Sequence, residues 1–488
     1  KGHIRILERM LFNSITFLVF FALVFVAYWG IVAKHLRWRN AFVLVCSYVF
    51  YGWWDWRFLS LIFISSLSDY LIGQRMEAAD NKGRKKKLLL VLSLVINLGI
   101  LGVFKYFNFF MDTLQYGMQD LGLDGTDWRL DIVLPVGISF YTFQTLSYTI
   151  DIYRGQLRAS RDPIAFFAFV SFFPQLVAGP IERAKDLLPQ FSVKPVFDQA
   201  AIRSGFLLAL WGLFKKVVIA DRLALFVDAA FDEPAGMGSG TAAVALLFFA
   251  FQLYLDFSAY SEIAIGVARM LGVRLSTNFK RPYLADSFGQ FWSRWHISLS
   301  SWFRDYLYIP LGGNRGGLTR TWLNIMVVFL LSGLWHGASW NFVLWGSLNG
   351  LFLIALDPLV IQPLRRLKAV GRVLQAVVVT LCWTLSLGFF RAQGWDGAVA
   401  AYTALGNSAE AFTVLGMSTA EFNLLLGLLG GMMLVEWIHE KWPILEERLH
   451  TSHFLIRWSV YYGLSMAIVL LGSYGMNVAD AQFIYFQF

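Results

Sequence analysis

The sequence contains little charge and almost no cysteine. Charged residues make up 15% of its 488 residues, whereas hydrophobic residues make up 57%. Soluble domains carry about 25% charged residues, so these proportions exclude a water-soluble domain and a disordered chain. The two cysteines, Cys46 and Cys382, both lie within apolar runs. This excludes a disulfide framework and a multi-cysteine metal site, and no metal is expected.

The charge that is present has a basic excess. Lys and Arg number 41 against 32 Asp and Glu, which gives a net charge of +9. Cytoplasmic loops of membrane proteins are rich in Lys and Arg, so the expected partner is the anionic lipid surface and not nucleic acid. The loop at residues 75–87 is strongly basic and is predicted to be cytoplasmic.

Long apolar runs recur along the whole chain. A helix needs roughly 20 mostly apolar residues to cross the hydrocarbon core of a bilayer. Two runs, at 40–74 and 321–356, exceed one crossing, and each is expected to contain two elements. We therefore predict an all-α integral membrane protein with about ten to thirteen membrane segments. The other candidate runs are 14–33, 88–110, 132–152, 163–180, 204–230, 241–272, 373–390, 421–437 and 455–474.

No soluble domain fits between these runs, so residues 10–488 are predicted to form a single polytopic membrane domain. Residues 1–9 are basic and precede Met10, and we interpret them as an upstream extension. A cleaved signal peptide is not expected, because no small-residue cleavage site follows the first apolar run.

His336 is the first candidate for a functional residue. It lies near the middle of residues 321–356, which carry no formal charge. Ionisable side chains at membrane depth are costly and mark functional sites by default. Gly333, Gly337 and Gly346 interrupt the run, which would allow the helix to break and the backbone to approach a ligand closely. The alternative is a buried neutral histidine that bonds a neighbouring carbonyl.

His296 is the second candidate. Residues 288–313 are too polar to span, and Trp292, His296, Leu299 and Phe303 follow helical spacing. This predicts a re-entrant or interfacial helix with His296 on its aromatic face, ended by the Pro-Leu-Gly-Gly sequence at 310–313. The alternative is an amphipathic surface helix whose histidine reaches toward the interface.

Two embedded histidines favour acyl transfer over redox chemistry. Haem ligation is not supported, because neither the segment of His296 nor that of His336 contains a second histidine at a suitable spacing. An imidazole with a pKa near about 6.5 can remove a proton from an attacking hydroxyl group at neutral pH. Neither a G-x-S-x-G elbow nor an H-E-x-x-H motif occurs, so a serine hydrolase or zinc protease is not supported.

Several ordered segments carry a family resemblance: 51–54 (YGWW), 137–140 (GISF), 178–180 (AGP), 254–258 (YLDFS), 295–300 (WHISLS), 304–308 (RDYLY), 311–315 (LGGNR) and 333–337 (GLWHG). Together they resemble the membrane-bound O-acyltransferase family, and most of all its bacterial branch that contains the membrane subunit of alginate O-acetylation. The likeness extends over most of the chain. Ala259, where the pattern has Gly, is a minor departure.

The resemblance implies a fold, a donor and roles for both histidines. The family's catalytic histidine falls on His336 and its variable partner position on His296. The family fold places helices around a central tunnel between a cytoplasmic donor side and an acceptor side. The implied donor is acetyl-CoA, used as a substrate with no bound cofactor. Basic residues expected near its phosphates are Lys215, Lys216, Arg222, Lys280 and Arg281; the alternative is that they anchor helix ends among lipid headgroups.

The chain ends in an aromatic tail at 483–488. Such a tail can pack against the helices or lie in the interfacial aromatic belt. It also resembles the C-terminal motif of a small subunit in the related teichoic-acid D-alanylation system, in which a tyrosine is proposed to carry the acyl group. On that reading Tyr485 is an acyl relay, because a phenol is a better leaving group than a sugar hydroxyl.

These features lead us to expect an O-acetyltransferase of the bacterial cytoplasmic (inner) membrane. It would pass acetyl toward an extracytoplasmic polysaccharide hydroxyl, with alginate among the possible polymers. The resembling systems use an esterase-like partner with a serine nucleophile for the final transfer. The alternative function is a transporter of a lipid-linked or acyl substrate, in which the histidines form a proton relay.

Overall fold

The structure is a computed structural model that describes residues 10–79, 83–123, 128–177, 179–234, 237–408, 412–474 and 483–484. All regular secondary structure in those residues is helical, and no strand occurs among them. The all-α prediction is therefore confirmed. The predicted extension at residues 1–9 and the predicted relay residue Tyr485 lie outside the described residues.

Seven helical stretches within the described residues are long and apolar enough to cross a membrane. This is fewer than the predicted segments, because some apolar runs fold as shorter helices and because the 52-residue stretch Trp340–Arg391 contains two of the predicted segments. The run at 163–180 divides into α7 (Pro163–Ser171) and α8 (Phe173–Leu176), and the 9 residues of α7 rise only about 14 Å. The seven stretches are Ile15–Val32, Gly83–Asp120, Ser239–Met270, Leu318–His336, Trp340–Arg391, Thr419–Lys441 and Phe454–Leu471.

The two longest apolar runs each contain two elements, as predicted. In the first, α2 (Leu36–Asp55) and α3 (Leu59–Ala78) are separated by one 3₁₀ turn. The carboxylate of Asp55 starts that turn by accepting from Arg57 N–H at 3.0 Å. In the second run, α15 (Leu318–His336) is followed by α16 (Trp340–Leu351).

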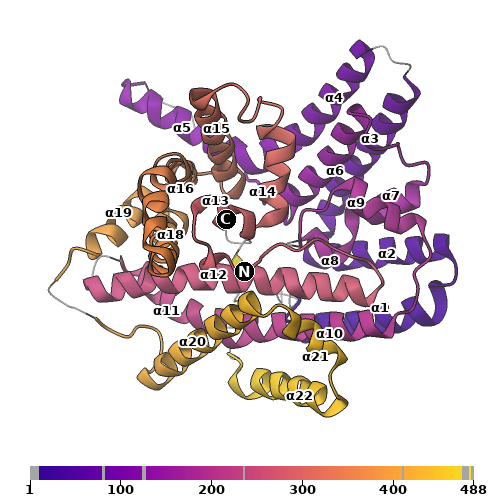
Figure 1. Cartoon of the computed structure of the whole chain (residues 1–488). Helices are drawn as coiled ribbons and strands as arrows, with labels where there is room; N and C mark the ends of the chain where they lie inside the picture. Colours follow the sequence, from indigo (N-terminus) through magenta and orange to yellow (C-terminus); the bar gives the residue numbers. More distant parts are fainter. Residues whose placement is uncertain are drawn as a thin grey trace, which may run out of the picture. The chain divides into compact units, whose positions relative to one another are not determined.

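The chain divides into two compact units, the first formed by Lys1–Phe206 and Ala264–Ser276. Within it, α3, α4 (Gly83–Leu101) and α6 (Ile138–Tyr153) pack against one another (Figure 1). A buried polar cluster joins them, in which Asp69 accepts from Ser93 Oγ at 2.6 Å and from Asn97 Nδ2 at 2.8 Å. The remaining helices of this unit include α1 (Ile15–Ala27), α5 (Phe107–Asp120) and α9 (Ala184–Leu187).

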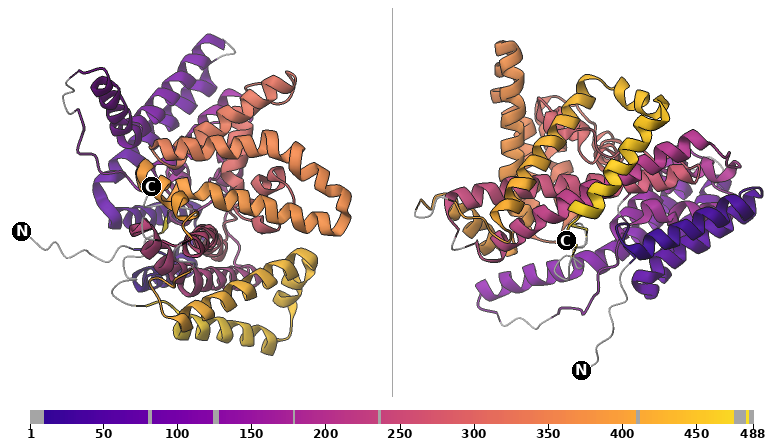
Figure 2. Two further views of the ribbon diagram at one scale, coloured as in Figure 1. Left: turned by 90° about the vertical axis from the view of Figure 1, so that its left-hand side faces the viewer. Right: turned by 90° about the horizontal axis from the view of Figure 1, so that it is seen from below.

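The second unit, formed by Leu207–Ile263 and Thr277–Phe488, contains both candidate histidines. Its apolar core surrounds α12 (Ser239–Met270), and α16 packs on both α15 and α18. Figure 2 shows α20, α21 and α22 as three consecutive helices in yellow. The bounds of its other helices are α11 (Asp221–Asp232), α13 (Phe288–Arg294), α14 (Ile297–Phe303), α17 (Gln362–Leu364), α18 (Lys368–Arg391), α19 (Gly394–Ala404), α20 (Thr419–Lys441), α21 (Ile444–Thr451) and α22 (Phe454–Leu471). Helix α10 (Gln199–Phe214), like α12, has residues in both units.

Candidate active site

His336 is the last residue of α15, at the turn that leads back into α16. Gly337 continues in an extended conformation, with φ −159° and ψ 149°. Ser339 then caps α16, because its hydroxyl accepts from Asn341 N–H at 3.2 Å. The helix break predicted from the glycine pattern is therefore confirmed, and it places His336 at a helix end.

Two glycines bring the backbones of α15 and α16 into contact. A Cβ atom added to Gly333 would collide with the carbonyl oxygen of Phe342. One added to Gly346 would collide with the carbonyl oxygen of Phe329. Only glycine fits such a close approach. The glycines were predicted to let the backbone approach a ligand, and in the structure they let two helices approach each other. With α15 and α16 packed this closely, His336 is only 4% exposed.

The structure corrects the continuous helix predicted around His296. Helix α13 ends at Arg294, Trp295 is extended, and His296 has the left-handed angles φ 43° and ψ 54° before α14 begins. Left-handed backbone costs an L-residue roughly 1–2 kcal/mol. The break has a packing reason: Trp295 and His296 are each 1% exposed, whereas neighbours on a continuous helix would point about 100° apart. The predicted end of the segment near Pro310 is confirmed, because helical structure stops after Tyr308.

Asn278 fixes the turn at His296. Its carbonyl oxygen accepts from Ile297 N–H at 2.9 Å, and its Oδ1 accepts from Ser298 Oγ at 2.9 Å. Its Nδ2 donates to Ser261 Oγ of α12 at 3.1 Å. These bonds tie the histidine segment to the central helix of the unit. No sequence pattern marked Asn278, because a single asparagine between loop residues carries no periodic signal.

The structure brings the two predicted histidines together. The ring centroids of His296 and His336 are 6.4 Å apart, and the ring planes are inclined by 52°. Aromatic rings surround the pair: Trp345 lies 5.1 Å and Phe390 5.4 Å from His336, while Phe257 lies 4.7 Å from His296. Apolar surroundings of this kind exclude water and strengthen polar interactions with a reacting group.

Burial determines the charge state of the His296 imidazole. Burial lowers the pKa of His296 to about 3, so its ring is uncharged at physiological pH. A neutral imidazole offers one N–H donor and one acceptor nitrogen. The His296 imidazole can therefore accept a hydrogen bond from a hydroxyl group or donate one to a carbonyl oxygen.

Both histidines lie in the part of the sequence that matches a known protein family. A sequence profile of the membrane-bound O-acyltransferase family matches residues 49–387, which include both histidines and more than half of the chain. The chain belongs to this family. It is a multi-pass membrane enzyme that transfers acyl groups, as the sequence motifs predicted.

The acyltransferase is similar to several bacterial proteins over most of its length. A protein named probable alginate O-acetylase from Azotobacter vinelandii is 41% identical over 406 residues, which cover 81% of this chain and 78% of that protein. Its namesake from Pseudomonas aeruginosa is 41% identical over 411 residues, with 81% and 75% covered. The peptidoglycan O-acetyltransferase of Helicobacter pylori is 36% identical over 378 residues, with 70% of each chain covered.

Three of the basic residues expected to contact the donor are buried in this acyltransferase. Lys215 Nζ donates to Ser258 Oγ at 2.7 Å and to Glu262 Oε1 at 2.8 Å. Lys216 forms ion pairs at 2.8 Å with Asp221 and at 2.7 Å with Asp256. The guanidinium of Arg222 donates to the carbonyl oxygens of Val218 and Leu471.

The other two basic residues lie close to the His296 segment. Lys280 is exposed, and its N–H donates to the carbonyl oxygen of Arg294 at 2.9 Å. Arg281 has a left-handed backbone, with φ 49°, and forms an ion pair with Glu440 at 2.7 Å. The five residues are therefore divided between buried pairs in the core and a more accessible pair beside the histidine turn.

The described part of the C-terminal tail packs near the histidines of the acyltransferase. The N–H group of Ile484 donates to Asp256 Oδ2 at 2.8 Å. The ring of Phe483 lies 4.6 Å from that of Tyr260 and 5.5 Å from that of Phe257. Phe257 in turn contacts His296. Asp256 belongs to the 254–258 segment that carries the family resemblance. Its contact with the tail was not predicted from the sequence.

Proposed function

We propose that this acyltransferase moves acetyl from cytoplasmic acetyl-CoA toward a hydroxyl group of an extracytoplasmic polysaccharide. The observation that carries the proposal is the meeting of His296 and His336 in an aromatic enclosure. The similar bacterial proteins named above are O-acetylating enzymes by name, and they support acetyl as the transferred group. Alginate and peptidoglycan are the acceptor polymers that those names suggest.

His336 is the proposed general base. Its imidazole takes the proton of the acceptor hydroxyl as the hydroxyl oxygen attacks the thioester carbonyl carbon. A new C–O bond forms and the C–S bond breaks. The proton then passes from the imidazolium to the CoA sulfur, so the acetyl ester and CoA thiol are the only products. His296 holds the base or the carbonyl in place through a hydrogen bond.

Tyr485 is the proposed first acceptor of the acetyl group. A tyrosine ester retains more transfer potential than a sugar ester, because phenol is the better leaving group. The burial of Phe483 and Ile484, each 2% exposed, supports a tail that lies beside the histidine pair. With such a carrier, CoA itself need not cross the membrane.

The family resemblance supports the remaining parts of the proposal. A central tunnel, lined by the histidines and flanked by further membrane segments, would connect the donor and acceptor sides of a single polytopic domain. Lys280 and Arg281 are the proposed contacts for the CoA phosphates, together with Lys215, Lys216 and Arg222, which are buried. An esterase-like partner with a serine nucleophile would finish the transfer outside the bacterial inner membrane.

Purified protein in lipid vesicles, supplied with acetyl-CoA labelled in the acetyl group, tests this function. We expect loss of the thioester, with label on the protein or slow release of acetate, and dependence of both on His336. A transporter would instead move the substrate with its thioester intact. That outcome would overturn the proposal.

A further inference from the structure

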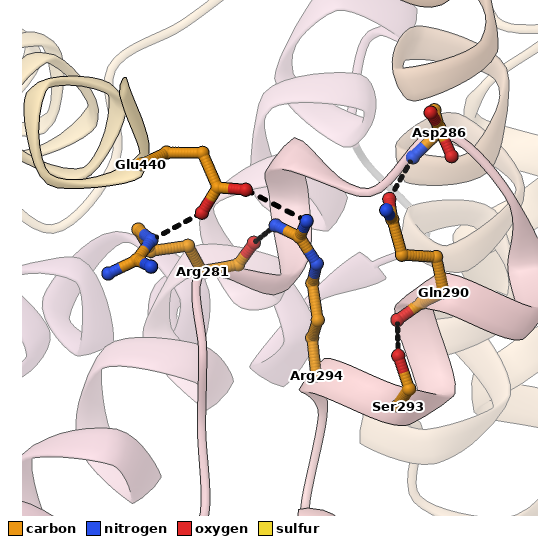
Figure 3. A network of polar contacts seen from close by, with 6 residues as sticks. All are labelled: Arg281, Asp286, Gln290, Ser293, Arg294 and Glu440. Carbon is orange, nitrogen blue, oxygen red and sulfur yellow. Dashed lines mark hydrogen bonds and ion pairs between the residues drawn. The ribbon is translucent and has the colours of Figure 1, made fainter. Parts of the chain in front are cut away.

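We propose that Glu440, near the end of α20, is a positioning residue that holds the histidine turn in its active shape. Its carboxylate accepts from Arg281 Nε at 2.7 Å and from an Arg294 side-chain nitrogen at 2.9 Å (Figure 3). Both of these partners are arginines of the segments beside His296, so Glu440 acts on the histidine through them. The structural role of Glu440 does not depend on the proposed function; only its expected effect on acetyl transfer rests on that function.

The two arginines lie on segments that run side by side next to His296. The N–H of Lys280 donates to the carbonyl oxygen of Arg294, and the Arg294 guanidinium donates to the carbonyl oxygen of Arg281 at 3.4 Å. Three residues farther along, Ile297 N–H donates to Asn278. His296 therefore lies between two backbone hydrogen bonds that join the same two segments. Glu440 links these segments again, because it pairs with Arg281 of one and Arg294 of the other.

Each segment contains a non-glycine residue with an unfavourable, left-handed backbone conformation. Arg281 and His296 have φ angles of 49° and 43°, although neither is glycine. Non-glycine residues stay in the left-handed region only where the surrounding contacts over-determine them. Two ion pairs to one carboxylate supply such contacts at Arg281 directly and at His296 through Arg294, which lies two residues before it.

The position of Glu440 on its helix indicates that the pairing matters. It is the penultimate residue of α20, where the negative end of the helix dipole disfavours a carboxylate. The two guanidinium groups offset that effect. Without the carboxylate, two like charges would face each other at the histidine turn.

A second contact holds α20 against the same core. Glu436 lies one turn before Glu440 and accepts a hydrogen bond from the Tyr254 hydroxyl of α12. The ring of Tyr254 lies 6.1 Å from that of Trp295, which is adjacent to His296. Helix α20 therefore presents two carboxylates, one toward the central helix and one toward the histidine turn.

The test compares Glu440→Gln with Glu421→Gln in the full-length protein. Glu421 lies at the opposite end of the same helix, where it completes the capping box with Ser418, so its loss weakens the start of α20 and leaves the Glu440 ion pairs in place. We expect Glu440→Gln to lower kcat for acetyl transfer about tenfold, equal to about 1.4 kcal/mol in the barrier. Glu421→Gln should keep the parental kcat, and Glu440→Asp should recover part of the loss.

Hydrogen–deuterium exchange of the peptide 278–298 separates this inference from the proposed function. We expect faster exchange there in Glu440→Gln but not in Glu421→Gln, whatever reaction the protein catalyses. Unchanged exchange would overturn the inference. Faster exchange with the parental kcat would also overturn it, because the turn would then open without consequence for transfer. Failure of the wild type to consume acetyl-CoA would count against the proposed function. The hydrogen–deuterium exchange of peptide 278–298 would still test whether Glu440 holds the histidine turn.

Discussion

The ring of Phe257 contacts both His296 and Phe483, at centroid distances of 4.7 Å and 5.5 Å. His296 lies at the turn between α13 and α14, and Phe483 lies close to the C-terminus of the chain. Asp256, the neighbour of Phe257 on α12, accepts from the backbone of Ile484. One segment of the central helix therefore joins the histidine pair to the C-terminal tail.

Substitutions at His296 should separate its backbone role from its imidazole. Asparagine tolerates the left-handed region, whereas a β-branched residue does not. We expect His296→Asn to fold with nearly parental stability and His296→Val to lose about 1–3 kcal/mol of unfolding free energy. Both should lower acetyl transfer. Thermal unfolding in detergent measures the difference, and equal stability of the two variants would contradict a strained turn.

The close contact of α15 and α16 predicts a large effect of Gly346→Ala. The added Cβ would collide with the carbonyl oxygen of Phe329 and push the helices apart. We expect a loss of about 1–3 kcal/mol in unfolding free energy, together with lower activity as His336 moves. Gly427→Ala on α20 is the matched control, because its Cβ would meet nothing within 4 Å. Equal stability of both variants would show that the glycine contact is unimportant.

Removal of the Phe483 ring should release the tail. The ring is 2% exposed and packs against Tyr260 and Phe257. We expect Phe483→Ala to speed digestion by carboxypeptidase and to lower acetyl transfer at least tenfold if the tail carries the acyl group. Phe454→Ala, at an exposed position of α22, should change neither. A parental digestion rate in Phe483→Ala would contradict a role of the Phe483 ring in holding the tail.

Loss of the Tyr485 hydroxyl should stop the proposed relay without affecting folding. We expect Tyr485→Phe to abolish polymer acetylation while the thermal unfolding midpoint stays the same. Mass spectrometry of the C-terminal peptide should show an acetyl group in the parent and none in the variant. Tyr474→Phe removes the hydroxyl of an exposed tyrosine outside the tail and serves as the control. Persistent acetylation in Tyr485→Phe would reject the relay.

The sequence predicted the parts of the fold that depend on local pattern. Apolar run length located the helices, and the glycines around His336 located the break after α15. Short runs were overcounted as crossings, because hydropathy does not show that 163–180 divides at Phe172. The histidines were found because an ionisable group in an apolar run is rare.

Long-range contacts could not be predicted in the same way. Helical spacing around His296 favoured one helix, yet the packing of Trp295 overrode it. Glu440 lies 159 residues from Arg281 in sequence, and nothing in either local pattern links them. Such pairings depend on how distant helices assemble, which a single sequence does not reveal.

The most direct test of the central claim is polymer acetylation in cells that depend on this protein and express His336→Ala at the parental level. General-base catalysis contributes roughly 10²–10⁴-fold, so acetylation should fall to the background of cells without the protein. His453→Ala, which alters an exposed residue before α22, should leave acetylation unchanged. Parental acetylation in His336→Ala would contradict the assignment of this histidine as the catalytic base.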